Sequence, residues 1–153
     1  MNISQEDNTR LHEILEKAKS FYNQKNEINC PYFGYKISLT SDGFNHLQHK
    51  PNRAPRDVKV QIMKLSLLKK ALEIIPKAGT LQEYRDVVEK IGKKGKDGFF
   101  KTKRVQYWGF HAILENKQRK IKVILKQVGD GKVIFWSVMP YDQKLYSENI
   151  DEN

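Results

Sequence analysis

The sequence predicts an α+β fold, with N-terminal helices packed on a C-terminal antiparallel sheet of three to four strands that form a β-meander. Two observations predict it. Apolar residues recur with helical spacing in the first half of the chain, and the last third alternates apolar with polar residues between turn signals. A chain of 153 residues suits one compact domain. We expect an N-terminal helix and connection over residues 1–30, a single α+β domain over residues 31–142 and a polar tail over residues 143–153.

Three segments have the spacing of helices. Residues 4–23 place apolar side chains at i, i+3, i+4 and i+7, which is typical of an amphipathic helix. Residues 56–75 carry a wider apolar stripe and therefore predict a well-buried helix. Thr80 and Glu83 have the spacing of a capping box, so a further helix is expected over residues 81–91.

Alternation with a period of two predicts the strands. Residues 35–40 have the pattern of a short half-buried strand, and residues 23–34 are expected to be a connection that leads into it. Residues 105–114, 119–128 and 133–139 are the three strands of the predicted meander. The sequence Gly-Asp-Gly-Lys between the last two is typical of a tight hairpin turn.

The chain is strongly basic, and the excess charge is concentrated. There are 28 Lys and Arg against 18 Asp and Glu, which gives a formal net charge of +10. Residues 90–104 contain seven Lys or Arg and one acid, Asp97. This pattern favours a polyanionic partner, most often nucleic acid, over a lysine-rich surface that serves solubility alone. The basic loop GKKGKDG at residues 92–98 lacks the spacing of a P-loop, which argues against binding of a nucleoside triphosphate.

Several function classes find no support in the residues. Cys30 is the only cysteine, so no internal disulfide and no cysteine-based metal site can form. His46 and His49 have few carboxylates near them, so we expect no metal and no cofactor. No apolar run is long enough for a signal peptide or a membrane span. We therefore expect a cytoplasmic protein, or one delivered into the cytoplasm of a target cell, with no membrane partner.

Metal-free cleavage of RNA fits the remaining residues better. It needs a group that accepts the 2′-hydroxyl proton, a group that protonates the leaving 5′-oxygen, and cations that stabilise the phosphate. Histidine suits proton transfer near neutral pH, while lysine and arginine suit the phosphate and aromatic rings can stack on unpaired bases. This combination is found in residues 42–53, DGFNHLQHKPNR, and in the predicted sheet.

The candidate catalytic residues are His46, His49, His111 and Ser137. The candidate substrate-binding residues are Lys50, Arg53, Tyr107, Lys122 and Lys126. Parity places Tyr107 and His111 on one face of a strand, and Lys122 and Lys126 on one face of the next. It also places Val133, Phe135, Ser137 and Met139 together on the last strand. The alternatives are structural: histidines buried in a helix or a sheet, and lysines on the solvated side of a one-sided sheet.

Three segments carry a resemblance to a known group of proteins: ISLTSDGFNHLQHK, VQIMKLSLLKKALEII and RKIKVILKQVGDGKVIFWSVMP. Their order resembles the barnase–EndoU–colicin–RelE-like nuclease superfamily, especially its phage-associated branch. The resemblance implies helices with a four-stranded antiparallel sheet, and metal-independent ribonucleases that include toxins aimed at RNA of the translation system. It implies that His46 is the family histidine, that Arg53 and a strand lysine hold phosphate, and that Ser137 is the polar residue of the last strand.

These observations predict a toxin-like, metal-independent endoribonuclease that cleaves by 2′-hydroxyl transesterification. Its partners would be RNA, such as tRNA or other RNA of the translation system, and an acidic inhibitor or antitoxin protein. Which histidine acts as acid and which as base stays open. The alternatives are a non-catalytic basic module that binds RNA or DNA, and an interaction domain with an acidic protein partner.

Overall fold

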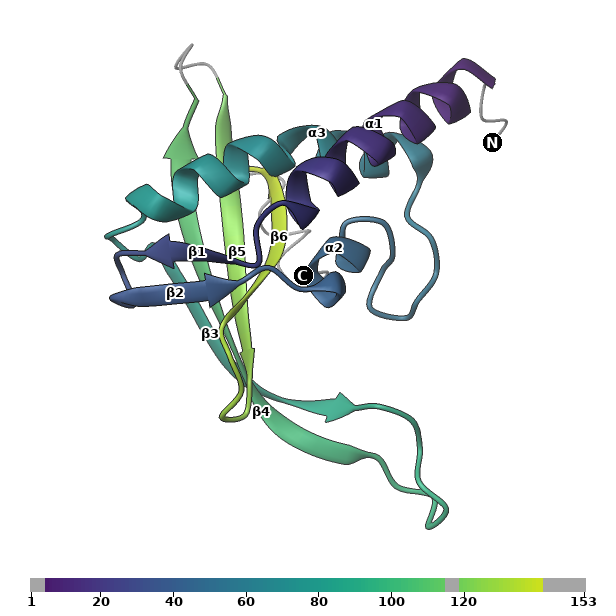
Figure 1. Cartoon of the computed structure of the whole chain (residues 1–153). Coiled ribbons are helices and arrows are strands. Elements are labelled where there is room, and N and C mark those ends of the chain that lie inside the picture. The colour runs from purple at the N-terminus through teal and green to yellow at the C-terminus, as the bar shows by residue number, and fades with distance from the viewer. Residues whose placement is uncertain (1–4, 115–118, 142–153) are drawn as a thin grey trace.

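The computed structural model describes residues 5–114 and 119–141 and has an α+β architecture (Figure 1). The predicted class, with an N-terminal helix, is confirmed. The helices are α1 (Gln5–Asn23), α2 (Ser41–His46), α3 (Val58–Ile74) and the 3₁₀ turn η1 (Ile75–Lys77). The strands are β1 (Glu27–Cys30), β2 (Tyr35–Ser38), β3 (Glu83–Ile91), β4 (Lys101–Ile113), β5 (Lys120–Val128) and β6 (Ile134–Pro140).

The sheet has six strands in the order β1-β2-β6-β5-β4-β3, and it is mixed. Strands β3 to β6 form the antiparallel meander, in which each strand pairs with the next along the chain. The antiparallel hairpin β1–β2 adds to the edge of β6 in the parallel direction, through the pair Ser38 and Ile134. The predicted sheet of three to four antiparallel strands is therefore correct for the meander but too small for the whole sheet.

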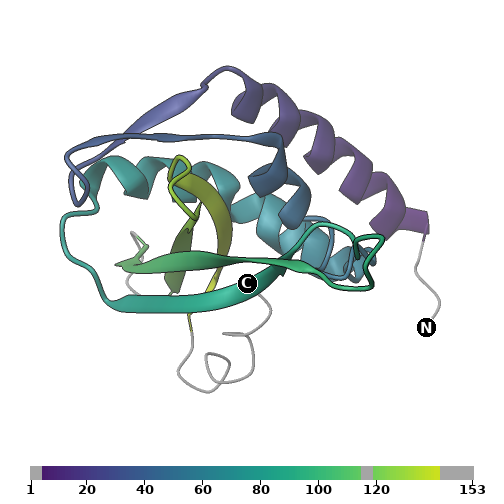
Figure 2. The ribbon, with the colours of Figure 1, turned by 90° about the horizontal axis from the view of Figure 1, so that it is seen from below.

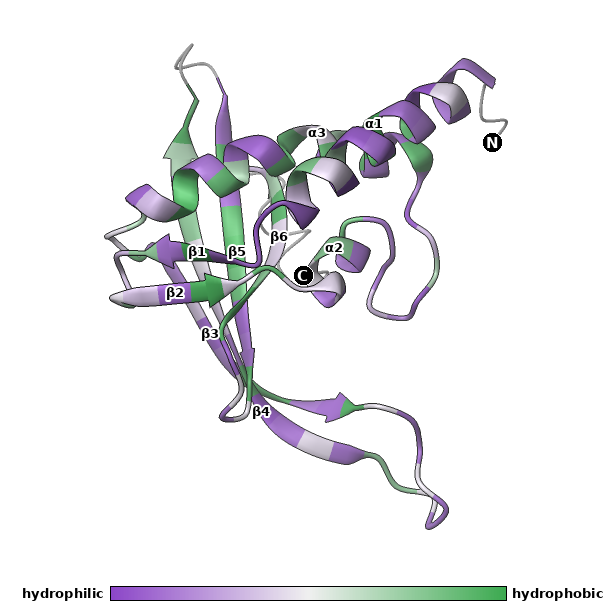
Figure 3. Ribbon diagram, in the orientation of Figure 1, coloured by the Kyte–Doolittle hydropathy of each residue, from purple (hydrophilic) through white to green (hydrophobic). Residues whose placement is uncertain are grey.

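Helices α3 and α1 lie on the same side of the meander (Figures 1 and 2). The apolar stripe of α3 is buried there, and α1 packs on α3 with Ala18 beside Leu65 and Leu68. Tyr22 of α1 reaches further and contacts Phe44 and Phe135. Apolar residues concentrate in α3 and the middle strands, whereas the outer parts of the molecule are hydrophilic (Figure 3). Burial of this stripe is the main stabilising term of the fold.

The helix predicted over residues 81–91 is wrong, because this segment is strand β3. The strand pairs with β4 along its whole length, and its charged side chains find cross-strand partners. Arg104 donates two hydrogen bonds to Asp86, at 2.9 and 2.8 Å. Glu83, which has the spacing of a capping residue, instead faces β4 and β5. Tertiary pairing has overridden the local helical signal.

The connection predicted over residues 23–34 also contains a strand, β1. Ile28 and Cys30 are buried while Glu27 and Asn29 are exposed, so the segment does alternate, but over only four residues. The strand predicted to begin at residue 105 begins earlier, at Lys101. Both differences have the same cause. A segment beside an existing strand gains backbone hydrogen bonds by pairing with it, and this pairing does not depend on the pattern of side chains.

One part of the meander extends beyond the rest of the sheet. Strand β5 pairs with β4 only from Val105 onward, so residues 88–104 form a two-stranded projection with no third strand. We call these residues the hairpin arm. In Figure 1 the arm runs below α2 and the loop that follows it, and the view from below shows it crossing them (Figure 2).

Candidate functional site

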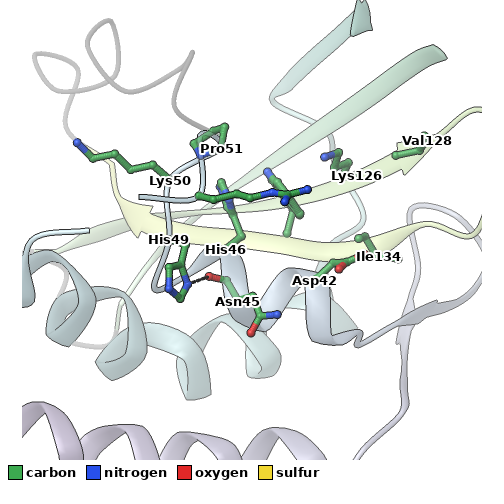
Figure 4. Close-up of a pocket in the computed structure, with 11 residues that line it drawn as sticks. Asp42, Asn45, His46, His49, Lys50, Pro51, Lys126, Val128 and Ile134 are labelled. Carbon is green, nitrogen blue, oxygen red and sulfur yellow. Dashed lines mark hydrogen bonds between the residues drawn. The ribbon is translucent and has the colours of Figure 1, made fainter. Parts of the chain in front are cut away.

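An open pocket of about 580 Å³ lies between α2, the loop after it and the adjoining ends of β5 and β6 (Figure 4). Five of the nine predicted site residues line it: His46, His49, Lys50, Arg53 and Lys126. His49 and Lys50 lie on one side of the pocket and Lys126 on the other (Figure 4). We call it the α2 pocket. It joins two segments that are about 75 residues apart in the sequence.

Helix α2 is held against β6 at Gly43 and His46. The Thr40 side chain caps the helix by accepting a hydrogen bond from the Gly43 backbone N–H. A Cβ atom at Gly43 would lie 2.0 Å from the carbonyl oxygen of Phe135, so only glycine allows the helix to come this close to the strand. One turn later, the His46 ring stacks on Trp136, with 3.9 Å between the ring centroids and 15° between the planes.

His46 is buried and neutral. It is 4% exposed, and Arg56 contacts it twice. The Arg56 Nε donates to the His46 carbonyl oxygen at 2.9 Å, and Nη2 donates to the ring Nε2 at 3.2 Å. Burial, together with the positive charges of Arg56, Lys64 and Lys126, lowers the pKa of His46 to about 2. Because Nε2 accepts a hydrogen bond, the ring proton is on Nδ1. A ring that stays neutral above its pKa cannot serve as a general acid near neutral pH.

Trp136 also contacts Lys126, the cation of the neighbouring strand β5. The Lys126 Nζ lies 3.6 Å from the centroid of the Trp136 ring. The stacked His46 ring already occupies the centre of one face of the indole, so Lys126 lies on the other. Burial lowers the pKa of Lys126, while Glu89 and Asp42 act in the opposite direction. The cation–π contact therefore fixes a partly desolvated ammonium at the wall of the pocket.

The loop after α2 supplies the exposed groups. His49 Nδ1 lies 3.3 Å from the backbone carbonyl oxygen of Asn45 (Figure 4). A carbonyl oxygen only accepts hydrogen bonds, so Nδ1 carries the proton and Nε2 of the neutral ring keeps a free lone pair. His49 is the imidazole of the α2 pocket that is both exposed and able to accept a proton.

A tight turn aims Arg53. The backbone N–H groups of Lys50 and Arg53 bond to the carbonyl oxygens of Ala54 and Lys50 respectively, each at 2.8 Å. Arg53 has φ 71°, in the left-handed region that residues other than glycine rarely adopt. Such conformations persist where the surrounding structure enforces them, and they are common at functional sites. Among the described residues, no carboxylate lies within ion-pair distance of Lys50, Arg53 or Lys126, although Asp42 and Glu89 act on Lys126 from further away.

A second group of titratable residues lies on the face of the meander opposite the core formed with α3. Glu83 on β3, His111 on β4 and Lys122 on β5 form what we call the Glu83 cluster. One Glu83 oxygen is hydrogen-bonded to His111 Nε2, and the other lies 3.4 Å from Lys122 Nζ. The His111 ring stacks on Tyr141, with centroids 4.0 Å apart.

Lys122 is 1% exposed, unlike the solvent-facing lysine expected from parity. Burial lowers its pKa, and the Glu83 carboxylate opposes that shift. His111 and Lys122 are thus brought together, but on either side of a carboxylate and outside the residues that line the α2 pocket. A cluster with its own anion is poorly suited to bind a phosphate.

Ser137 and Tyr107 are also engaged within the protein. Ser137 is buried and accepts a hydrogen bond from Lys64 Nζ at 3.1 Å. The Tyr107 hydroxyl donates to Glu89 at 2.9 Å, and burial raises its pKa. Neither residue lines the α2 pocket.

The predicted parity of the last strand is wrong because β6 carries a bulge. Phe135 pairs with Leu125, but Ser137 pairs with Ile124, so Trp136 is an extra residue in the ladder. A bulge re-aims side chains, and here Phe135 joins the main core while Met139 faces the other side of the sheet.

Sequence reasoning missed Arg56 and underrated Trp136. Arg56 is buried and fixes His46, yet nothing in its neighbourhood distinguishes it from the chain's other Lys and Arg. Trp136 sits on a core-like strand, and only the bulge turns it to the pocket. Gly43 carried a usable signal, since a glycine inside a helical turn costs stability unless a close approach requires it.

Within residues 5–114 and 119–141, no group of three or more His, Cys, Asp or Glu could hold a metal ion. In the same residues, no helix has the length and apolarity needed to span a bilayer.

No protein-family model matches the chain, and neither a curated protein nor a solved structure is significantly similar to it.

Proposed function

We propose that the chain is an endoribonuclease that needs no metal ion and that cleaves RNA at the α2 pocket. One observation carries the proposal. The pocket brings together an imidazole with a free Nε2, from His49, and three cations, from Lys50, Arg53 and Lys126. These groups match what transesterification of RNA requires, and they come from two distant parts of the sequence.

In this proposal His49 Nε2 takes the proton of the 2′-hydroxyl. The 2′-oxygen then bonds to the adjacent phosphorus, and the bond from phosphorus to the 5′-oxygen breaks. The 5′-oxygen leaves with the bonding electron pair and takes a proton from the Lys50 ammonium, which solvent reprotonates. Arg53 and Lys126 stabilise the added negative charge on the phosphate. His46 is a positioning residue, because it holds Trp136 and through it Lys126.

The fold supports the same proposal. A long buried helix followed by a four-stranded antiparallel meander is what the resemblance to the nuclease superfamily implies, and α3 with β3 to β6 has this arrangement. The volume of the pocket lies within the ordinary range for small-ligand sites. In this proposal the protein acts on RNA of a cytoplasm, its own or that of a target cell, and a predicted acidic inhibitor would bind the same cations.

A second candidate is a non-catalytic RNA-binding module. The observation that favours it is the state of the other candidate groups: His46 is neutral and bonded to Arg56, and Lys122 is buried beside Glu83. The pocket therefore offers one exposed imidazole for proton transfer, and not a pair of histidines that could act as base and acid. This candidate predicts salt-dependent binding without turnover.

The deciding experiment is incubation of end-labelled RNA with the purified protein in EDTA. The proposal predicts fragments that end in a 2′,3′-cyclic phosphate, and no cleavage of the same RNA with 2′-O-methyl riboses. His49→Ala should lower the rate by roughly 100- to 10,000-fold, the usual contribution of a general base. His12→Ala is the matched control, since His12 is an exposed histidine on α1. Binding of RNA without any cleavage by the wild type would favour the second candidate.

A further inference from the structure

The hairpin arm is the most basic projection of the molecule. Residues 88–104 include seven Lys or Arg and two acids, Glu89 and Asp97. The seven cations are Lys90, Lys93, Lys94, Lys96, Lys101, Lys103 and Arg104, and all are exposed. Glu89 accepts a hydrogen bond from Tyr107, and Asp97 Oδ1 accepts one from the backbone N–H of Phe99 at 3.0 Å. Both acids therefore have structural partners, and the outer surface of the arm is positive.

Two phenylalanines stand at the tip of this arm. Phe99 is 74% exposed and Phe100 is 40% exposed, although phenylalanine is normally among the buried residues. The tip is built to present them: Gly95 donates a backbone hydrogen bond to the Phe99 carbonyl oxygen at 2.8 Å, and Gly98 has φ 85°, which glycine adopts easily. Lys90 Nζ lies 5.1 Å from the Phe100 ring centroid. Exposed aromatic rings among lysines are the usual means of holding single-stranded nucleic acid.

The arm begins where the α2 pocket ends. Val128, which lines the pocket, pairs with Val105. The preceding residue of β4, Arg104, is the last residue of the arm. At the usual rise of a strand, Phe100 lies roughly 17 Å further along the chain. Both views place the arm on the side of the molecule that carries α2 and its loop (Figures 1 and 2). A strand of RNA that leaves the pocket would therefore meet the arm within a few nucleotides.

We propose that the hairpin arm holds the RNA strand that flanks the cleaved phosphate, with Phe99 and Phe100 stacked on unpaired bases and the arm lysines on the backbone. The inference rests on the proposed RNA substrate and adds to it a second contact region with a preference for unpaired RNA. Charge argues against self-association through the arm, because two copies would bring seven cations against seven.

The test compares the wild type with a Phe99→Ala/Phe100→Ala variant. Neither phenylalanine belongs to a core cluster, so the variant should fold normally, and Tyr35→Ala, at an exposed aromatic of the β1–β2 hairpin, is the matched control. Binding is measured with an unstructured 2′-O-methyl RNA of about 12 nucleotides, for which we expect a loss of roughly 5- to 150-fold per stacked base. Replacing Lys93, Lys94 and Lys96 with Gln should reduce the salt slope of binding by about 2.

The same variants are assayed for cleavage of unmodified RNA of that length and of a trinucleotide. The variant should cleave the trinucleotide like the wild type and the longer RNA less efficiently at low concentration. Wild-type binding of the 12-nucleotide RNA by the Phe variant would overturn the role of the arm while leaving the pocket intact. Arm-dependent binding without cleavage would overturn the ribonuclease proposal alone. Binding of the arm to phosphatidylserine vesicles, with RNA affinity unchanged in the variants, would assign it to a membrane surface instead.

Discussion

The α2 pocket and the Glu83 cluster contain the same kinds of residue in opposite electrostatic states. Each pairs a histidine with a lysine of β5, His49 with Lys126 in the pocket and His111 with Lys122 in the cluster. In the cluster a carboxylate lies between the two, and the lysine is buried. In the pocket the cations face an open space, and within residues 5–114 and 119–141 Asp42 is the only carboxylate that lines it. The difference shows that a histidine and a lysine on neighbouring elements do not by themselves make a binding site. The position of the nearest carboxylate decides which positive charges are available to a ligand.

The largest effect on stability is expected from removing that carboxylate. Glu83→Ala would remove the carboxylate that lies 3.4 Å from the buried Lys122 Nζ, and breaking a buried ion pair typically costs roughly 3–5 kcal/mol. Urea unfolding monitored by the tryptophans measures the loss. Glu83→Gln combined with Lys122→Met should recover most of it, since no buried charge is then left alone. Loss of RNA cleavage in this folded double variant would mean that the cluster acts on the substrate.

The next effect is the pH dependence that His46 contributes. Its pKa is about 2 in the folded protein and about 6.5 in the unfolded chain, so the unfolded state binds more protons in between. Stability is therefore greatest above pH 6.5 and falls as the pH drops below it, by about 2 kcal/mol between pH 7 and pH 5. His46→Gln keeps an acceptor for Arg56 but removes the titration. The unfolding free energy of the wild type minus that of His46→Gln should be smaller at pH 5 than at pH 7 by that amount. The same difference at both pH values would contradict a buried, neutral His46.

The smallest effect concerns the strained turn at Arg53. Arg53→Gly and Arg53→Ala both remove the charge, but only glycine adopts φ 71° freely. We expect the glycine variant to be more stable than the alanine variant by about 1 kcal/mol, while both cleave RNA equally poorly. If Arg53→Gly keeps wild-type cleavage, the arginine side chain does not hold the phosphate.

Much of the fold could be predicted from periodicity. The stripes of α1 and α3 and the turn before β6 identify helices and strands, because each depends on local spacing. Strand β3 could not be identified in this way, since its inward residues, such as Glu83 and Arg85, are polar and their partners lie on β4 and β5. Long-range pairing, not local propensity, determines such a segment.

The candidate site was predictable in residue type but not in arrangement. His49, Lys50 and Arg53 belong to one loop, so their proximity follows from the sequence. The addition of Lys126 depends on the close approach of Gly43 to β6 and on the bulge at Trp136. The glycine indicates a close approach but not the strand that approaches, and the bulge has no pattern in the sequence. For the same reason, parity alone could not separate Lys126, which lines the pocket, from Lys122, which is buried beside Glu83.

The comparison of the two regions is tested most directly by a pair of histidine variants. His49→Gln and His111→Gln are assayed side by side for cleavage of one RNA in EDTA, at equal folded fraction. We expect His49→Gln to lose cleavage by at least roughly 100-fold, as for a missing general base, and His111→Gln to cleave like the wild type once its lower stability is taken into account. Full activity of His49→Gln together with loss in His111→Gln would place the chemistry at the Glu83 cluster and contradict the assignment to the α2 pocket.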